Sequence, residues 1–303
     1  MCVIRTEKLG KTYEGGTVAL SALDLEVRAG EVFGFLGPNG AGKSTTIQLL
    51  LNFIRPTSGR ALLFGKPATS ASSRQRIGFL PESVSLNGYY TGWGLLDFYA
   101  KLHRVAEADR PRRVDDLLHR VGLQDASRRR VSQYSKGMVQ RLGLAQALIG
   151  DPDLLLLDEP TTYLDPLGRR DFRDIVLDLK SGGKTVFICS HVLSEVESVC
   201  DRVAILQNGV LRRSGTLEEL SQARGSTIVA SGLNASAIAA ISATAAHLTL
   251  QGAEAAITCR NAEVRREVEQ VLVAEGARVE SIERDKESLE DIFLSAVDPR
   301  DGS

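Results

Sequence analysis

Long apolar runs are absent from this 303-residue sequence: no stretch approaches the ~20 residues that a membrane-spanning helix needs. No stretch resembles a signal peptide either. We therefore expect any role at a membrane to depend on a partner protein.

Cysteine is scarce, and its spacing carries no motif. Cys2, Cys189, Cys200 and Cys259 are far apart, and no two of them form a Cys-x-x-Cys pair. This pattern indicates neither a zinc site nor a disulfide framework, so a reducing compartment is expected.

An excess of either charge is also missing, because 37 Lys and Arg residues balance 38 Asp and Glu residues. Without a basic field, no nucleic-acid partner is expected. Arginine runs occur at 110–113 and 128–130, and we interpret them as solvated helix ends.

Aromatic residues make up only 5% of the chain, and residues 89–99 are their densest stretch. Tyr89, Tyr90, Trp93 and Tyr99 lie there. Two interpretations stay open: packing within a core, or a docking surface for another protein, since aromatics are enriched at interface centres.

A chain of this length suggests about two domains. The composition shifts near residue 222 toward Ala and Ser, which predicts a first domain over 1–222 and a second over 223–303. The second reads as strand, helix, strand, strand, helix, strand, which is ferredoxin-like. The expected elements are 227–230, 234–241, 247–250, 255–259, 262–275 and 278–282, followed by a helix over 289–294.

The most specific motif is a phosphate-binding loop at residues 37–45. A buried strand over 31–36 leads into it, and a helix follows with Ile47, Leu50, Leu51 and Ile54 on one face, up to Pro56. Glycines let the backbone wrap around phosphate oxygens, and the loop and helix N–H groups point at the anion. Lys43 is expected to bridge the β- and γ-phosphates, and Ser44 to hold Mg²⁺.

A second constellation follows four consecutive leucines, 154–157, which predict a central parallel strand. Asp158 and Glu159 stand at its carboxyl end, where α/β sheets bind ligands. We expect Asp158 to support Mg²⁺ and Glu159 to orient and polarise the attacking water. His191 stands at the end of another buried strand, 185–190, where a structural role and a catalytic role both stay open.

Three further local signals are clear. Ser135 is placed to cap a helix that Gly150 and Pro152 end, and this capped start can also receive an anion. Asn208 and Gly209 predict a hairpin turn. Tyr13 precedes the phosphate loop by about two dozen residues, so both stacking on a purine and simple packing stay open.

Together these motifs closely resemble the nucleotide-binding subunit of an ATP-binding cassette (ABC) transporter, from residue 3 to about residue 217. Residues 134–141 match the signature motif, which other phosphate-loop ATPases lack. The sequences at 80–82, 134–138 and 288–293 look like the exporter subgroup, which moves drugs, polysaccharides or lipids and includes the ATPase of nitrous-oxide reductase maturation.

The resemblance implies a phosphate-loop NTPase cassette: an α/β fold with a mostly parallel central sheet, an antiparallel β subdomain and a helical subdomain, followed by the small α+β domain. It implies ATP hydrolysis with ATP and Mg²⁺ as cofactors. Catalysis is expected from Lys43, Glu159 and His191, and metal binding from Ser44, Asp158 and Glu82. The expected nucleotide-binding residues are Tyr13, Asn39, Gly40, Ala41, Gly42, Lys43, Ser44, Thr45, Glu82, Ser135, Gly137 and Asp165.

The resemblance also implies partners. Two cassettes would pair head to tail, as a homodimer or with another ABC ATPase, so that Ser135 and Gly137 touch the γ-phosphate held by Lys43 of the other chain. Transmembrane permease subunits would hold the pair at the cytoplasmic face of the inner membrane.

Two positions depart from the family pattern. Glu82 stands where most transporter cassettes carry a Mg²⁺-contacting Gln, and Tyr163 stands where a Gly is usual before Leu164 and Asp165. A soluble ATP-gated clamp and a non-hydrolysing tethering module are the competing functions. The cargo is not indicated by any residue of the chain.

Overall fold

The computed structural model describes residues 2–220, 223–244, 246–251, 254–259, 262–286 and 288–297. It divides into two compact units. One comprises the chain up to Leu217 together with Ala296 and Val297, and the other comprises Glu218–Ser295. Within the described ranges, no helix is long and apolar enough to cross a lipid bilayer.

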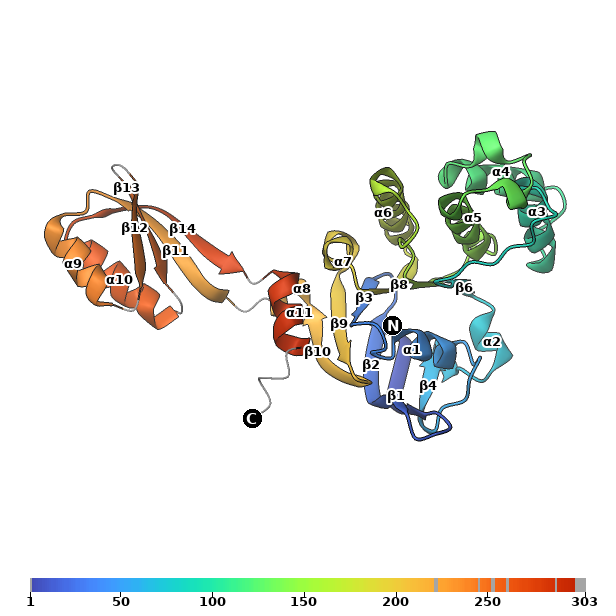
Figure 1. The fold of residues 1–303 in the computed structure, drawn as a ribbon, viewed down its shortest axis with the longest axis horizontal. Helices are drawn as coiled ribbons and strands as arrows, with labels where there is room; N and C mark the ends of the chain where they lie inside the picture. Colours follow the sequence, from blue (N-terminus) through green and yellow to red (C-terminus); the bar gives the residue numbers. More distant parts are fainter. Residues whose placement is uncertain are drawn as a thin grey trace. The chain divides into compact units, whose positions relative to one another are not determined.

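The first unit is built on a central sheet with the strand order β10–β9–β3–β8–β7–β6 (Figure 1). Its strands run parallel except β10, which pairs antiparallel with β9. The bounds are β3 Val32–Leu36, β6 Ile77–Leu80, β7 Leu154–Asp158, β8 Thr185–Ser190, β9 Arg202–Gln207 and β10 Val210–Thr216. Every residue of β3, β7 and β8 is buried, as their uniformly apolar sequences predict for parallel strands covered on both faces.

An antiparallel sheet with the order β2–β1–β4–β5 forms the second layer. Its strands are β1 Cys2–Thr12, β2 Val18–Arg28, β4 Ser58–Leu63 and β5 Lys66–Pro67. Phe33 and Phe187 stack in the shared core with ring centroids 5.8 Å apart, and Phe35 lies 5.4 Å from Phe187. Aromatic pairs at such distances contribute about 0.5–1.5 kcal/mol beyond burial.

Helix α1, Lys43–Leu50, starts directly at the phosphate loop, but it is shorter than predicted. The apolar periodicity placed Ile54 on the same helix. Asn52 instead adopts φ 56°, a left-handed conformation that ends an α-helix. Ile54 still packs against the core, from the turn beyond the helix.

Helices α3 Gly92–Leu102, α4 Arg110–Arg120 and α5 Lys136–Leu148 form a cluster of their own beyond β6 (Figure 1). Ser135 caps α5 as predicted, because its Oγ accepts a hydrogen bond from the N–H of Met138 at 3.2 Å. Gly122, with φ 68°, follows α4 and serves as the predicted stop. The short elements of this unit are α2 Ala71–Arg74, η1 Gln124–Ala126 and η2 Val131–Gln133.

The structure contains two helices that were not predicted from the sequence: α6, Pro166–Ser181, and α7, Leu193–Val199. Asp165 caps α6, since its Oδ1 accepts a hydrogen bond from the N–H of Gly168 at 2.9 Å. Each helix follows a carboxyl end of the central sheet, α6 after β7 and α7 after β8. They therefore flank the edge at which Glu159 and His191 stand.

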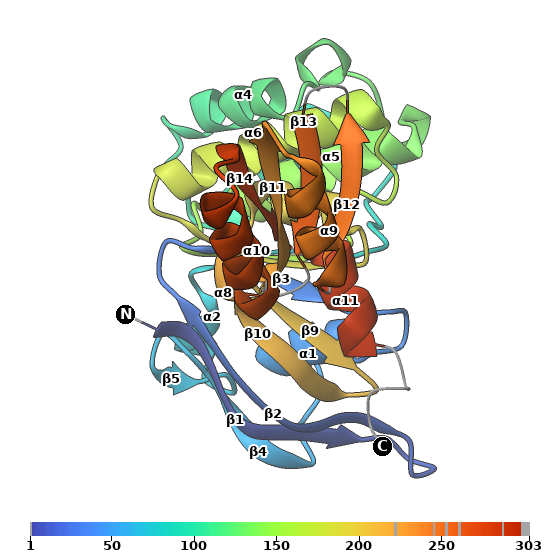
Figure 2. The ribbon, with the colours of Figure 1, turned by 90° about the vertical axis from the view of Figure 1, so that its left-hand side faces the viewer.

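The second unit is an α+β sandwich whose strand order, β12–β13–β11–β14, is that of a ferredoxin-like sheet. Helices α9 and α10 lie on one face of this sheet (Figure 2), and the core between them includes Ile228, Ile241, Ile257 and Val268. The bounds are α8 Leu217–Leu220, β11 Ala223–Ser231, α9 Ala235–Ala243, β12 His247–Gln251, β13 Glu254–Cys259, α10 Ala262–Ala274, β14 Arg278–Lys286 and α11 Leu289–Val297.

Candidate active site

The phosphate loop wraps between the end of β3 and the start of α1. Gly40 and Gly42 have φ values of 80° and 111°, which side chains rarely tolerate. At Gly42 a Cβ would also lie 2.4 Å from the carbonyl oxygen of Ala19. The loop therefore needs glycine both for its turn and for its close backbone packing.

Lys43 points back into this loop rather than out to solvent. Its Nζ donates hydrogen bonds to the carbonyl oxygens of Gly37 at 2.6 Å and Pro38 at 3.3 Å. The same Nζ lies 3.3 Å from Glu159 Oε1, and both side chains are less than a tenth exposed. The lysine charge is thus compensated by a buried carboxylate.

Glu159 connects Lys43 to His191. Its Oε2 lies 2.8 Å from His191 Nδ1, while the imidazole is about half exposed, at 49%. Glu159 itself adopts φ 47°, a strained conformation for a residue with a side chain. The sheet thus brings together the three residues predicted to be catalytic, in one continuous polar chain.

Asp158 lies beside this chain at the end of β7. Its Oδ1 is buried and, within the described ranges, has no hydrogen-bond partner. Burial raises the pKa of this carboxyl above its ordinary value, while the hydrogen bond from Ser44 opposes the rise. An orphaned, buried carboxylate oxygen next to a hydroxyl is an oxygen donor set that suits Mg²⁺.

The described residues contain no group of three or more His, Cys, Asp or Glu side chains arranged to hold a metal ion. Mg²⁺ usually takes one or two protein ligands and completes its shell with phosphates and water. Ser44 and Asp158 would hold it. Glu82, the third predicted ligand, is exposed and lines the same hollow.

The residues surround an open hollow of about 440 Å³. Its wall includes predicted residues from four separate parts of the chain and also Ala19 and Thr162, which were not predicted to lie at the site. The predicted members are Asn39, Gly40, Ala41, Gly42, Lys43, Ser44, Thr45, Glu82, Glu159 and His191.

Tyr13 lies at the margin of this hollow. Its hydroxyl is 3.4 Å from Thr45 Oγ1, and the Lys11 ammonium lies 5.3 Å from the ring centroid. The ring is 39% exposed, so one part of it is open to a stacking partner.

Ser135, Gly137 and Asp165 do not line this hollow. Ser135 and Asp165 instead cap α5 and α6. Tyr163 contacts the start of α5: the Lys136 ammonium lies 5.4 Å from its ring centroid, and a Cβ at Gly137 would lie 3.1 Å from its carbonyl oxygen. Tyr163 thus has a cation–π contact within its own chain.

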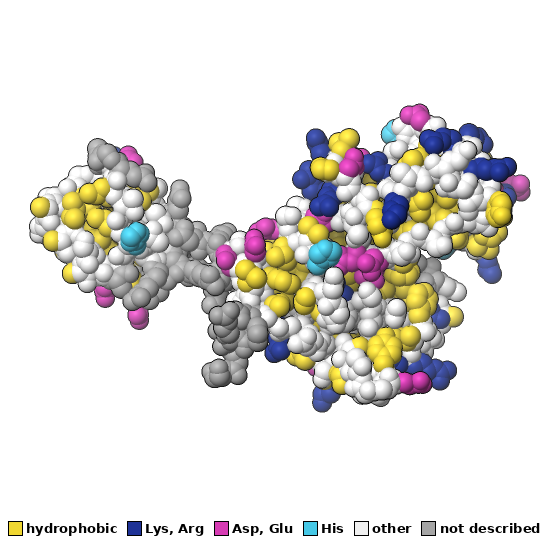
Figure 3. Space-filling model, in the orientation of Figure 1, with side chains coloured by type: hydrophobic (Ala, Val, Ile, Leu, Met, Phe, Trp, Pro, Cys, Tyr) yellow, Lys and Arg dark blue, Asp and Glu magenta, His cyan; other side chains and the backbone are white. Residues whose placement is uncertain are grey.

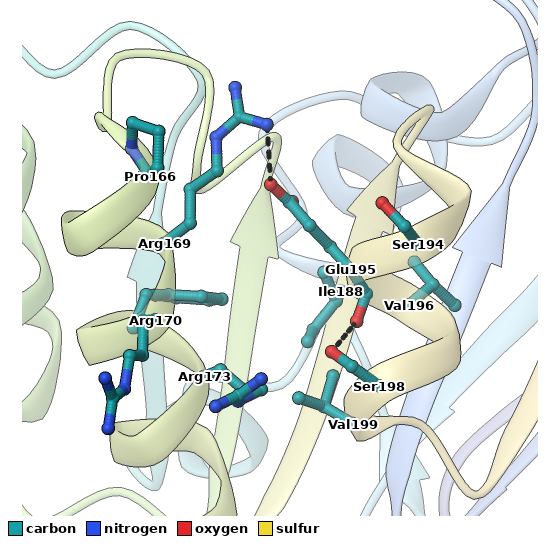
Figure 4. Close-up of a pocket in the computed structure, with 11 residues that line it drawn as sticks. Pro166, Arg169, Arg170, Arg173, Ile188, Ser194, Glu195, Val196, Ser198 and Val199 are labelled. Atoms are coloured by element: carbon teal, nitrogen blue, oxygen red, sulfur yellow. Dashed lines mark hydrogen bonds and ion pairs between the residues drawn. The ribbon is translucent and has the colours of Figure 1, made fainter.

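A second polar chain, also missed from the sequence, links the segment after Glu159 to α6 and α7; Figure 4 shows its contact between Arg169 of α6 and Glu195 of α7. Thr161 Oγ1 donates a short hydrogen bond to Glu195 Oε2, and Arg169 Nη1 lies 3.4 Å from Glu195 Oε1. Glu195 lies in the first turn of α7, and no sequence signal indicated its contacts with Thr161 and Arg169.

Comparison with known proteins agrees with this geometry. The family model described as "ABC transporter" matches residues 20–162. An uncharacterised ABC transporter ATP-binding protein of Nostoc is 49% identical over 226 residues, which cover 72% of this chain and 68% of that protein. The daunorubicin/doxorubicin resistance ATP-binding protein DrrA of Streptomyces peucetius is 41% identical, with 75% and 69% covered. The bacitracin transport ATP-binding protein BcrA of Bacillus licheniformis is 39% identical, with 69% and 68% covered.

Solved structures share the cassette fold. CbiO1 of Clostridium perfringens, part of an ABC transporter complex, superposes with a TM-score of 0.66 at 30% identity and covers 72% of this chain and 90% of its own. A dimeric ATP-binding cassette bound to ADP and Pi also superposes with a TM-score of 0.66, over 70% of this chain and 98% of that structure. Its sequence identity is 23%, so this comparison supports the fold alone. The matched region spans about two thirds of each curated relative. On these grounds the chain belongs to the ABC transporter family, as an ATP-binding subunit.

Proposed function

We propose that this chain hydrolyses Mg-ATP at Glu159 and that the associated closure of a cassette dimer powers export through separate transmembrane subunits. The observation that carries the proposal is the buried contact of Glu159 with Lys43 and His191 beside a phosphate loop. Relatives named for drug resistance and bacitracin transport favour export over a soluble clamp. The Glu159–His191 contact favours hydrolysis over a purely tethering role.

Each residue has a distinct part in this proposal. The loop N–H groups and Lys43 bind the phosphates, and Tyr13 stacks on the base. Ser44 and Asp158 would hold Mg²⁺, which would supply positive charge that neutralises the phosphates. Glu159 accepts a proton from the attacking water, and His191 holds that carboxylate in orientation.

The dimer completes the site. Ser135 and Gly137 lie at the start of α5, whose first turn carries no acidic residue. This helix start is suited to meet the γ-phosphate bound by the other chain, because helix N-termini attract anions. Asp165 lies in the segment that would face the partner.

An exposed apolar surface fits the transmembrane partner. Tyr89 is 88% exposed, Tyr90 and Phe98 pack together at 6.0 Å while staying partly exposed, and Leu102 is 61% exposed. Exposed aromatic groups of this kind mark protein interfaces. Contact with a membrane, at the cytoplasmic face of the inner membrane, would come through this partner.

The central test uses Glu159→Gln, which keeps the side-chain shape but removes the carboxylate. With Mg-ATP this variant should run as a dimer, and with ADP as a monomer, in size-exclusion chromatography with light scattering. Adding Ser135→Arg should abolish the dimer while nucleotide binding remains. Glu197→Gln, an exposed change on α7, is the matched control and should behave as wild type. A Glu159→Gln protein that stays monomeric in saturating Mg-ATP argues against the mechanism.

We also propose that the cassette spans 1–222 and that 223–303 forms a separable accessory domain. A chain ending at Gln222 should stay folded and bind ATP, because the phosphate loop and its core lie before this point. Among the described residues it loses Ala296 and Val297 of the first unit and, with them, the hydrogen bond from Gln207 Nε2 to the carbonyl of Val297, which contributes about 1 kcal/mol. Aggregation of the shortened chain would contradict the boundary.

A further inference from the structure

A pocket of about 240 Å³ lies between α6 and α7, outside the nucleotide hollow. Its charged wall is mostly basic: it is lined by Arg169, Arg170 and Arg173 of α6 and by one carboxylate, Glu195 of α7. Arg169 and Arg173 reach from α6 toward α7 in Figure 4, and Lys and Arg side chains gather over α6 in Figure 3.

Arg169 pairs with Glu195, but Arg173 of this wall is poorly compensated. Within the described ranges, Arg173 pairs only with its chain neighbour Asp174, at 3.6 Å and with both side chains exposed, a geometry worth little in water. Other arginines of the cassette pair between elements, as Arg141 does with Asp171 at 3.3 Å. The pocket therefore carries positive charge that the protein leaves available to a ligand.

The rest of the wall is apolar. Phe172, Val196 and Val199 are buried side chains at its floor, and Ile188 of β8 lies beneath them. Ligand sites of this kind combine an apolar lining with a few charged groups that fix orientation. The volume lies below the ~300–1,000 Å³ of drug-sized sites, so the occupant must be small.

We propose that this pocket binds a small amphipathic anion, a carboxylate on a short apolar chain, and that its occupation slows ATP hydrolysis. The planar guanidinium groups of Arg169 and Arg173 match a carboxylate, and the chain would lie on the apolar floor.

The coupling runs through Arg169. This residue pairs with Glu195, which also accepts the hydrogen bond from Thr161, two residues after Glu159. An anion that draws Arg169 away leaves Glu195 without its cation. Helix α7 starts two residues after His191, whose Nδ1 lies 2.8 Å from Glu159 Oε2. A loosened α7 would therefore move the imidazole away from this carboxylate.

The binding half is tested by titration calorimetry on the full chain with octanoate as the probe. Octanoate should bind one site with saturation. Two controls should bind at least about tenfold more weakly: acetate, which lacks the apolar chain, and octan-1-ol, which lacks the charge. Arg173→Gln should raise the dissociation constant of octanoate about tenfold. Arg212→Gln, which removes the same charge at an exposed position on β10, should leave it unchanged. Absence of saturation, or equal binding by Arg173→Gln, overturns the site.

The regulatory half rests on the proposed hydrolysis, and its test is separate. Saturating octanoate should lower the wild-type ATPase rate, Arg173→Gln should resist this effect, and Glu195→Gln should be slow without octanoate. Octanoate binding with an unchanged rate overturns the coupling. A chain that hydrolyses no ATP contradicts the proposed function, while the titration still decides the pocket.

Discussion

Glu159→Gln should also tighten nucleotide binding by the monomer, independently of any dimer. In the structure Lys43 is held by Glu159 at 3.3 Å and by two loop carbonyls, so the lysine must leave a buried carboxylate before it can reach a phosphate. Lys43 Nζ and Glu159 Oε1 form an ion pair without a hydrogen bond, and breaking a buried ion pair costs about 3–5 kcal/mol. Even half of the lower value corresponds to about a tenfold change in the dissociation constant.

The assay is titration calorimetry with ADP, because ADP lacks the γ-phosphate that would join two chains. Glu159→Gln should bind ADP about tenfold more tightly than wild type. His191→Ala leaves the contact between Lys43 and Glu159 in place and should bind ADP within about twofold of wild type. The difference should persist at high salt, since buried pairs are screened little. Equal ADP affinity of the Gln variant and wild type would refute the competition between carboxylate and phosphate.

Three further outcomes are expected. Lys43→Ala should abolish phosphate release from Mg-ATP, because it removes the cation placed for the β/γ-phosphates; release at the wild-type rate would refute the assignment. Asp158→Asn should raise the free energy of unfolding of the metal-free protein by about 1–3 kcal/mol, because it replaces a buried carboxylate whose Oδ1 has no partner within the described ranges, while Mg²⁺-dependent ATPase activity is lost. Denaturant titration without Mg²⁺ measures this, and a lower stability would contradict it. Burial raises the pKa of the Cys200 thiol, so iodoacetamide at pH 8 should label it only after unfolding, as mass spectrometry can follow; rapid labelling of the native chain would contradict this.

The sequence predicted those parts of the molecule whose signals are local. The phosphate loop, the leucine run of β7 and the Asn208–Gly209 turn each combine a short motif with one element, and each lies where it was predicted. The active site followed from topology, because the ends of parallel strands meet at one edge.

Contacts between distant elements were beyond the sequence. The link from Thr161 through Glu195 to Arg169 joins three segments, and no single segment carries its pattern. The cation–π contact of Lys136 with Tyr163 depends in the same way on how α5 packs against the segment before α6. The early end of α1 was missed because Asn52 overrides an apolar period that continues past it.

The turn between β9 and β10 has a consequence for engineering the chain. By sequence it is an ordinary surface hairpin, yet Gly209 donates its N–H to the carbonyl of Ala41 in the phosphate loop and accepts from the N–H of Ser21, at 2.9 and 2.8 Å. A peptide tag inserted there would pull apart the backbone that shapes the loop. Gly232, directly after β11, has open space where a Cβ would stand, so a tag or fluorophore belongs there instead.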